Sequence, residues 1–210
     1  MANQQKKVSD AVIKRLPRYF RYLADLKENN VLRISSKALS EKMGFTASQI
    51  RQDLSCFGGF GQQGYGYNVE SLYNELRKIL GVDKTYGIII IGAGNLGQAI
   101  ANHGKFEKRG YFLKGIFDVS KDLIGNKING IEIMPIDKLS GFIKANHIDI
   151  AVLTVPRNVT GKVADDIVEM GIKGIWNFSA MDLKVPDDVV VENVHLSDSI
   201  MVLGYKIKNN

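Results

Sequence analysis

Residues 88–97, Ile-Ile-Ile-Ile-Gly-Ala-Gly-Asn-Leu-Gly, decide the fold of the larger part of this 210-residue chain. Four consecutive isoleucines predict a buried β-strand, and residues 96–101 are compatible with a helix. A GxGxxG loop between a strand and a helix is typical of a dinucleotide site. Its first glycine allows the tight turn, its second lets the backbone approach a pyrophosphate, and its third lets the helix pack closely on the sheet. The candidate cofactor-binding residues of this loop are Gly92, Ala93, Gly94, Asn95, Leu96 and Gly97.

An acidic residue lies at the position where such a site needs one. Residues 115–118, Gly-Ile-Phe-Asp, predict the next strand, and Asp118 follows Gly97 by 21 residues. An acid about 20 residues beyond the loop typically hydrogen-bonds the ribose hydroxyls of a dinucleotide. The same carboxylate would repel a 2′-phosphate, so the sequence favours NAD(H) over NADP(H) as the cofactor. Alone, Asp118 would equally suit a turn at the end of a strand.

Further strands and helices alternate along residues 131–178. Strands are predicted at 131–134, 148–155 and 174–178, with helices at 136–146 and 159–170. This alternation predicts βαβ units and a parallel, Rossmann-type α/β sheet, and we assign residues 85–194 to this domain. Ligands bind at the carboxyl edge of such sheets. Thr154, Val155 and Pro156, and also Asn177–Ser179, follow strands there; they are secondary cofactor candidates, with capping of a loop as the alternative.

The positive charge is confined to the first part of the chain. The net charge is +6; residues 1–84 carry 14 Lys/Arg and 8 Asp/Glu, whereas the remainder carries 14 of each. A basic segment joined to a neutral one is typical of a DNA-binding module, although a solvated basic surface would look the same by charge alone.

Residues 9–56 predict a helix-turn-helix. A first helix is expected from Ser9 or Asp10 to about Lys27, with a kink or a break at Pro17. A second should run from 37 to 43 and end at Gly44, and a third, from 47 to about 56, should begin with a capping box in which Thr46 is the N-cap. Two helices joined by a short turn with glycine are typical of DNA readers, and a plain helical bundle is the alternative.

The third helix and the glycine-rich segment after it carry the predicted DNA contacts. The N-terminal part of such a helix enters the major groove. Residues 57–67 alternate glycine with aromatic residues and predict a β-hairpin wing; a glycine-rich nucleotide loop is the alternative. An amphipathic linker helix is expected at 69–80, which places a winged-helix domain at residues 1–84. The candidate DNA contacts are Arg15, Arg18, Ser48, Gln49, Arg51, Gln52, Gly61, Gly64 and Tyr65.

The last segment, residues 195–210, predicts an amphipathic helix that follows the completed sheet. Its apolar stripe consists of Leu196, Ile200, Leu203 and Ile207. The stripe must pack either on its own chain or on a second subunit. Since an inverted-repeat DNA site requires a two-fold dimer, we expect exchange of this helix in a homodimer.

Several classes of protein fit the sequence poorly. No stretch approaches the roughly 20 apolar residues of a membrane span, and a single cysteine, Cys56, together with an N-terminus that lacks an apolar core, favours a reduced cytoplasmic protein. No motif for a metal site is present, and no Tyr is followed four residues later by Lys, as a dehydrogenase proton relay would require. We therefore expect a protein that is not an enzyme; an NAD-dependent oxidoreductase with an N-terminal interaction domain is the alternative.

The motifs together resemble the Rex family of redox-sensing transcriptional repressors. The resemblance is carried by Arg15–Pro17, Gln49–Gly58, Gly64–Tyr67, the glycine loop, Phe117–Asp118, Leu153–Pro156 and Val191–Val194. It implies a homodimer that represses fermentative and respiratory genes on a double-stranded, inverted-repeat operator. It further implies that NADH releases the operator, that NAD⁺ competes without releasing it, and that the C-terminal helix lies between the partner's two domains.

One pair of positions departs from the resemblance. Some family members carry a Tyr and an Asp that make a switch contact near the nicotinamide, and His103 and His195 stand at those positions here. Arg21 matches a family arginine that pairs with the Asp in the DNA-bound form. The resemblance therefore makes His103 a cofactor candidate and Arg21 and His195 switch candidates. Because histidine titrates near neutral pH, the histidine pair would make the NADH response pH-sensitive.

Overall fold

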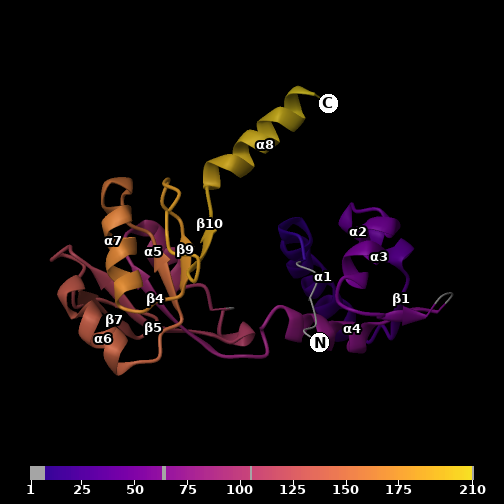
Figure 1. Cartoon of the computed structure of the whole chain (residues 1–210), viewed down its shortest axis with the longest axis horizontal. Coiled ribbons are helices and arrows are strands. Elements are labelled where there is room, and N and C mark those ends of the chain that lie inside the picture. The colour runs from indigo at the N-terminus through magenta and orange to yellow at the C-terminus, as the bar shows by residue number, and fades with distance from the viewer. Residues whose placement is uncertain (1–7, 63–64, 105, 210) are drawn as a thin grey trace. The chain divides into compact units, whose positions relative to one another are not determined.

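A computed structural model describes residues 8–62, 65–104 and 106–209 (Figure 1). The chain divides into two compact units, Met1–Lys84 and Thr85–Asn210. The division falls where the excess of positive charge ends. None of the helices in the described part of the chain is long and apolar enough to cross a lipid bilayer.

The N-terminal unit is built from four helices and a small antiparallel sheet. The helices are α1 (Asp10–Glu28), α2 (Ser36–Met43), α3 (Ala47–Ser55) and α4 (Val69–Ile79). Their apolar faces meet in one core that contains Leu16, Leu23, Ile50, Leu54 and Leu76. Helix α4, expected as a linker, is an integral part of this core because Val69, Leu72 and Leu76 are buried in it.

Helix α1 runs without a break through Pro17, so of the two predicted outcomes, a kink or a break, the break is wrong. Proline removes one backbone hydrogen bond and disfavours the interior of a helix. Here buried side chains lie on both sides of it, among them Val12, Leu16, Phe20 and Leu23. Their packing on a single core face outweighs the local cost at Pro17.

The predicted wing is a hairpin of β2 (Gly61–Gln62) and β3 (Gly66–Asn68), and β1 (Arg33–Ile34) pairs with the other side of β3. Gly61 is paired with Tyr67 and Gln62 with Gly66. Gly66 has a φ of +68°, and a Cβ there would lie 2.6 Å from the carbonyl oxygen of Ile34. Glycine is therefore required where β1 approaches the hairpin. The candidate Gly64 lies outside the described residues.

The C-terminal unit is a seven-stranded sheet in the order β10-β9-β8-β4-β5-β7-β6. Six strands are parallel, and only the edge strand β6 is antiparallel. The chain places β4 at the centre, adds strands on one side and then on the other, which is the Rossmann order. The strands are β4 (Tyr86–Ile91), β5 (Tyr111–Asp118), β6 (Lys127–Ile128), β7 (Ile131–Pro135), β8 (Ile150–Leu153), β9 (Gly174–Asn177) and β10 (Val190–Asn193).

Helices cover the two faces of this sheet unequally (Figure 1). Helices α6 (Leu139–Ala145) and α7 (Arg157–Glu169) pack on the face that contains Ile89 and Ile91. Helix α5 (Asn95–Ala101) packs on the opposite face, against Ile90. Two 3₁₀ turns, η1 (Glu107–Arg109) and η2 (Ile136–Lys138), precede β5 and α6. Helix α8 (Leu196–Lys208) follows β10 at the end of the chain.

Candidate nucleotide and nucleic-acid sites

The glycine loop lies at the point where the strand order of the sheet reverses. Strand β4 ends at Ile91, and its neighbour β8 ends at Leu153. The loops that leave these strands, residues 92–97 and 154–156, therefore share the carboxyl edge of the sheet. Open α/β sheets bind their ligands at such a switch point. The structure thus brings together two groups of candidates that are about 60 residues apart in the sequence.

Two of the loop glycines are required by close backbone contacts, and one faces open space. A Cβ on Gly97 would lie 2.0 Å from the carbonyl oxygen of Gly92. Gly92 has a φ of +100°, and a Cβ there would lie 2.7 Å from the carbonyl oxygen of Thr154. A Cβ on Gly94 would meet nothing within 4 Å. Gly92 and Gly97 therefore shape the loop, whereas Gly94 borders open space. Gly94 and Asn95 are exposed, whereas Ala93 is buried and Leu96 half-buried.

Asp118 and Thr154 both contact the loop. One Asp118 oxygen accepts a hydrogen bond from the Ala93 N–H at 2.5 Å, and the other accepts from the Ser120 N–H at 2.8 Å. The Thr154 hydroxyl donates to the Gly92 carbonyl at 2.6 Å. Each carboxylate oxygen retains acceptor capacity for a ribose hydroxyl. This hydrogen bond from Thr154 holds the loop in place, a role that the position of Thr154 in the sequence does not reveal. Val155 is half-buried and Pro156 exposed, directly before α7.

A second polar cluster lies at the carboxyl ends of β9 and β10. Asn177 is buried and donates to the side chain of Asn193 and to the carbonyl of Met181. Its own side-chain oxygen accepts from the Ser179 N–H, and the Ser179 hydroxyl bonds the Thr160 hydroxyl at 2.7 Å. These groups satisfy one another. The structure therefore favours the capping alternative for Asn177 and Ser179.

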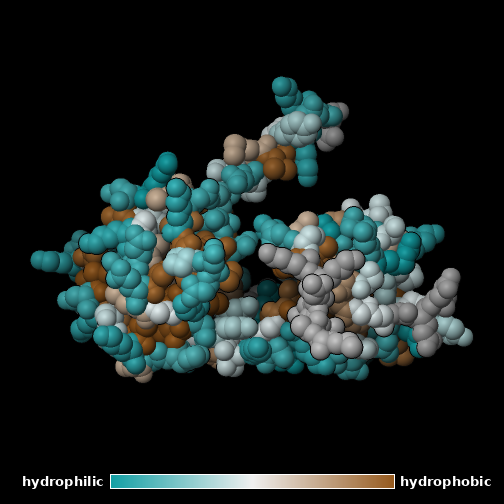
Figure 2. All heavy atoms as spheres, in the orientation of Figure 1, coloured by the Kyte–Doolittle hydropathy of each residue, from teal (hydrophilic) through white to brown (hydrophobic). Residues whose placement is uncertain are grey.

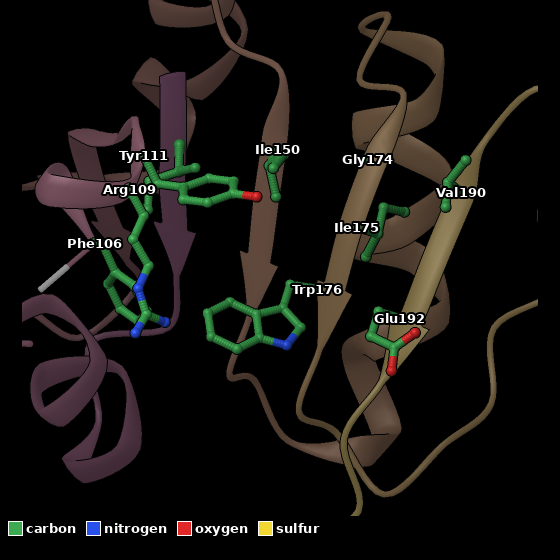
Figure 3. A pocket seen from close by; sticks show the side chains of 10 residues that line it. Phe106, Arg109, Tyr111, Ile150, Gly174, Ile175, Trp176, Val190 and Glu192 are labelled. Carbon is green, nitrogen blue, oxygen red and sulfur yellow. The ribbon is translucent and has the colours of Figure 1, made fainter. Parts of the chain in front are cut away.

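His103 lies away from the glycine loop in this chain. It follows α5 at the end opposite to the loop and is exposed. The centroid of its ring lies 4.7 Å from the centroid of the Phe106 ring. An apolar cavity of about 340 Å³ lies near these residues, over the amino-terminal halves of the strands (Figure 3). Figure 3 shows Phe106, Tyr111 and Trp176 around it, with Glu192 at one side. Ligands of this fold bind at the carboxyl edge, whereas this cavity lies over the amino-terminal halves of the strands.

Both helices of the helix-turn-helix have side-chain N-caps. The Ser35 hydroxyl accepts from the Ala38 N–H, and the predicted N-cap Thr46 accepts from the Gln49 N–H at 3.1 Å. The predicted capping box is only half formed, because the Gln49 side chain bonds Asp53 and not the Thr46 N–H. Gly44 ends α2 with a φ of +69°, in the left-handed region. These contacts fix the turn between α2 and α3. Ser48, Arg51 and Gln52 are exposed along α3, and the Arg51 guanidinium donates to the Ser36 hydroxyl.

A buried carboxylate anchors α3 to α1. Asp53 is 0% exposed and accepts two hydrogen bonds from Arg15, at 2.6 and 2.8 Å. It also accepts from the Tyr19 hydroxyl at 2.7 Å and from the Gln49 amide at 2.9 Å. Burial raises the pKa of Asp53, but the hydrogen bonds from Arg15, Tyr19 and Gln49 outweigh it and hold that pKa below its usual value. Burial and the bond to Asp53 raise the pKa of Tyr19.

Two arginines predicted to contact DNA also make contacts within the domain. The Arg15 guanidinium forms a bidentate pair with Asp53, since a buried carboxylate requires a cationic partner, and its contact with DNA stays a prediction, as does that of Arg18. Arg18 is exposed, yet its guanidinium donates to the Met43 carbonyl at the end of α2 and lies over the Phe45 ring. Both side chains therefore hold the helix-turn-helix together from α1.

The wing brings an additional arginine to the basic surface. The guanidinium carbon of Arg33 on β1 lies 5.9 Å from the centroid of the Tyr65 ring. The same guanidinium donates a hydrogen bond to the Tyr65 carbonyl. Tyr65 is 68% exposed. The sequence pattern indicates Tyr65 but not Arg33, because only the pairing of β1 with β3 places this arginine beside the hairpin.

In the single chain, the switch candidate Arg21 and the last helix are exposed, whereas His195 is half-buried. Arg21 is exposed on α1, and His195 lies 3.1 Å from a carboxylate oxygen of Asp182. The stripe of α8 is unburied, with exposed fractions of 62% for Leu196, 63% for Ile200, 50% for Leu203 and 70% for Ile207. Figure 2 shows apolar side chains at the surface of this helix. In the described chain nothing covers the stripe.

Comparisons with known proteins agree with this organisation. Residues 7–55 match a family described as "Putative DNA-binding protein N-terminus", and residues 83–181 match one described as "CoA binding domain". A basic helix-turn-helix joined to a Rossmann sheet with a GxGxxG loop defines the class of nucleotide-responsive DNA-binding regulators.

The relatives identify the family within this class. The chain is 64% identical over 95% of its length, and over 89% of the relative, to the redox-sensing transcriptional repressor Rex of Caldanaerobacter subterraneus subsp. tengcongensis. It is 59% identical to the same-named protein of Clostridium perfringens, over 99% of this chain and 98% of that one. The chain belongs to the Rex family of redox-sensing transcriptional repressors.

Solved structures of a Rex-family repressor called RSP are also similar. RSP in complex with β-NAD⁺ and operator DNA has a TM-score of 0.91 and 62% identity, covering 96% of this chain and 93% of RSP. RSP in complex with β-NADH has a TM-score of 0.90 and 59% identity, covering 97% of this chain and 96% of RSP. The winged-helix and Rossmann organisation predicted from the sequence is therefore confirmed.

Proposed function

We propose that this protein is a transcriptional repressor that binds operator DNA through its N-terminal unit and NAD(H) through its C-terminal unit, and that NADH releases the operator. The observation that carries the proposal is the 62% identity, over 96% of the chain, to a repressor crystallised with NAD⁺ and operator DNA. Fermentative and respiratory redox genes are the proposed targets. The protein is a regulator and not an enzyme, like the repressors to which it is related.

The proposed nucleotide site is the carboxyl edge around the glycine loop. Gly94 and Asn95 border the space for the pyrophosphate, and Asp118 accepts from the ribose hydroxyls while it holds Ala93. An acid at this place favours NAD(H) over NADP(H). Val155 and Pro156, which precede α7, lie toward the nicotinamide half of the cofactor, while Thr154 supports the loop.

The proposed DNA interface combines α3 and the wing. Gln49, Arg51 and Gln52 reach base edges or phosphates of the major groove, where glutamine pairs with adenine and arginine with guanine. Ser48 contacts the backbone near the start of α3. The wing with Gly61 and Tyr65, supported by Arg33, lies along the adjacent phosphates.

We also propose that the protein acts as a homodimer on an inverted-repeat operator, in the cytoplasm where the DNA lies. The uncovered apolar stripe of α8 supports this, because a face of this size in a single chain needs a partner. Exchange of α8 between subunits would bring His195 of each chain to its partner, and the dimer would then switch as one body.

The proposed switch is a shift between two dimer arrangements. Only one of them spaces the two α3 helices to fit successive half-sites of an operator. NADH must bind the other arrangement more tightly, since a ligand with equal affinity for both states shifts nothing. NAD⁺ occupies the same site without this preference, so it competes with NADH and leaves the operator bound.

A mobility-shift assay tests this function directly. A labelled duplex, selected by the protein from a randomised inverted-repeat library, is titrated with protein alone, with NAD⁺ and with NADH. We expect NADH to release the duplex and NAD⁺ to leave it bound. DNA binding that is unchanged by NADH would contradict the proposed sensing of NADH. Oxidation of NADH with any substrate would instead support the oxidoreductase alternative.

A further inference from the structure

Gln49 is the one DNA-facing candidate on α3 whose side chain is bonded to the buried carboxylate. Its amide nitrogen, Nε2, donates to Asp53 Oδ1 at 2.9 Å, one helical turn away. Ser48, Arg51 and Gln52 are exposed on the same helix, whereas Gln49 is half-buried. Gln49 therefore lies at the border between the core of the domain and the surface that faces DNA.

The carboxylate determines which end of the amide faces outward. An ionised carboxylate only accepts hydrogen bonds, so it can be faced by the NH₂ group of Gln49 but not by its oxygen. Asp53 is held in the ionised form by Arg15, which donates two hydrogen bonds to it, and by Tyr19. Because the oxygen and nitrogen of an amide point about 120° apart, Oε1 is turned away from Asp53, with one N–H of the NH₂ group remaining free.

We propose that Asp53 is a positioning residue for DNA specificity: it fixes the Gln49 amide so that an acceptor and a single donor face the major groove. This inference rests on the proposed function. An acceptor next to a donor complements adenine, which presents its N6 amino group beside N7. Guanine and thymine carry an acceptor oxygen at the position of that amino group. The oxygen of the fixed Gln49 amide would face this acceptor, and two acceptors form no hydrogen bond. Asp53 thus enforces adenine at one position of each half-site without touching DNA.

The replacement Asp53→Asn tests the inference because it keeps the shape and removes the charge. An amide at position 53 can donate or accept, so Gln49 is free to turn over and to offer its NH₂ group to guanine or thymine. The affinities of wild type and variant are measured for the selected duplex and for duplexes with each base pair substituted in turn. We expect discrimination against guanine to fall roughly tenfold at a single position per half-site, with other positions unchanged.

Two further variants test whether Asp53 affects DNA specificity through Gln49. Gln49→Ala should lose discrimination at that same position, and adding Asp53→Asn to it should change the preference no further. Tyr19→Phe removes another hydrogen bond from Asp53 but leaves Gln49 bonded, and it should keep the wild-type preference. If Asp53→Asn alone unfolds the domain, Arg15→Gln with Asp53→Asn removes both charges together and carries the same expectation.

The outcomes separate this inference from the proposed function. An Asp53→Asn protein that folds and keeps the wild-type preference at every position overturns it. So does a Gln49→Ala protein with an unchanged preference, because Gln49 then reads no base. In both cases, release of the duplex from the wild-type protein by NADH would still support the repressor function. A wild-type protein that selects no duplex would instead refute that function.

Discussion

At the scale of single residues, the three loop glycines are not equivalent. The Gly94→Ala variant should fold normally, since its Cβ meets nothing within 4 Å, but should bind NADH more weakly because the methyl group enters the pyrophosphate space. The Gly97→Ala variant should distort the loop itself, since its Cβ would lie 2.0 Å from the Gly92 carbonyl. Calorimetric titration with NADH and thermal unfolding separate the two effects. Equal loss of stability in both variants would contradict this assignment.

A second prediction at this scale concerns the stability of the N-terminal unit in acid. The pKa of Asp53 is lowered in the folded state, so its ion pair stabilises the fold fully above the unfolded value of about 4. That contribution is lost as the pH falls through the folded pKa. We expect the free energy of unfolding, followed by urea titration and the methyl NMR signals of Ile50 and Leu54, to decrease below about pH 4.

The control for this prediction is the Asp53→Asn variant. It should be less stable at neutral pH, because the half-buried Arg15 is left without its carboxylate partner. Its stability should then depend less on pH between about 5 and 2 than that of the wild type. An identical dependence in both proteins would show that other carboxylates control the acid transition.

At the scale of elements, α8 carries the prediction of the dimer. Leu203→Asp places a charge in the apolar stripe and should yield monomers, because burying an unpaired carboxylate at an apolar interface is strongly unfavourable. Lys208→Asp changes the charge of the same helix outside the stripe and should leave the dimer intact. Sedimentation equilibrium measures both. A Leu203→Asp protein that stays dimeric, or a wild type that is monomeric, would contradict the role of α8.

The elements also show what the sequence could and could not predict. Strand β4, the loop and α5 follow directly from the isoleucine run and the glycine spacing, and the caps at Thr46 and Gly44 follow from local chemistry. Strand β10 was recognised only as a family motif, because its residues are mostly exposed at an edge and lack a buried pattern. Of the kink or break predicted at Pro17, the break is wrong because tertiary packing overrides a local preference.

The candidate functional residues likewise include some that the sequence predicts and some that it does not. The nucleotide loop and Asp118 could be identified because their spacing in the sequence reflects their chemistry. The role of Arg15 could not, because its partner Asp53 is 38 residues away and only the packing of α1 on α3 brings them together. Thr154 is a candidate from the sequence, but its bond to the loop, like the contacts of Arg33 and Asp53, follows only from the three-dimensional structure.

At the scale of the whole molecule, we expect a pH-dependent switch. The resemblance to the Rex family places His103 and His195 at the positions of a tyrosine–aspartate contact, and histidine is the residue type whose charge changes most readily between about pH 5 and 8. We expect the NADH concentration that releases half of the operator to change between about pH 6 and 8, and the double replacement with Tyr and Asp to reduce that change. A flat response in the wild type would remove the histidines from the switch.

The central claim is that NADH and operator DNA favour different states of one dimer. Linkage then requires that each ligand weaken the binding of the other by the same factor. The most direct measurement is calorimetric titration of NADH into the protein, free and saturated with the selected duplex, compared with the fall in DNA affinity caused by NADH. We expect NADH and the duplex to weaken each other's binding by equal factors of about tenfold or more, and NAD⁺ to have no such effect. An NADH affinity that is unchanged by the duplex would contradict it.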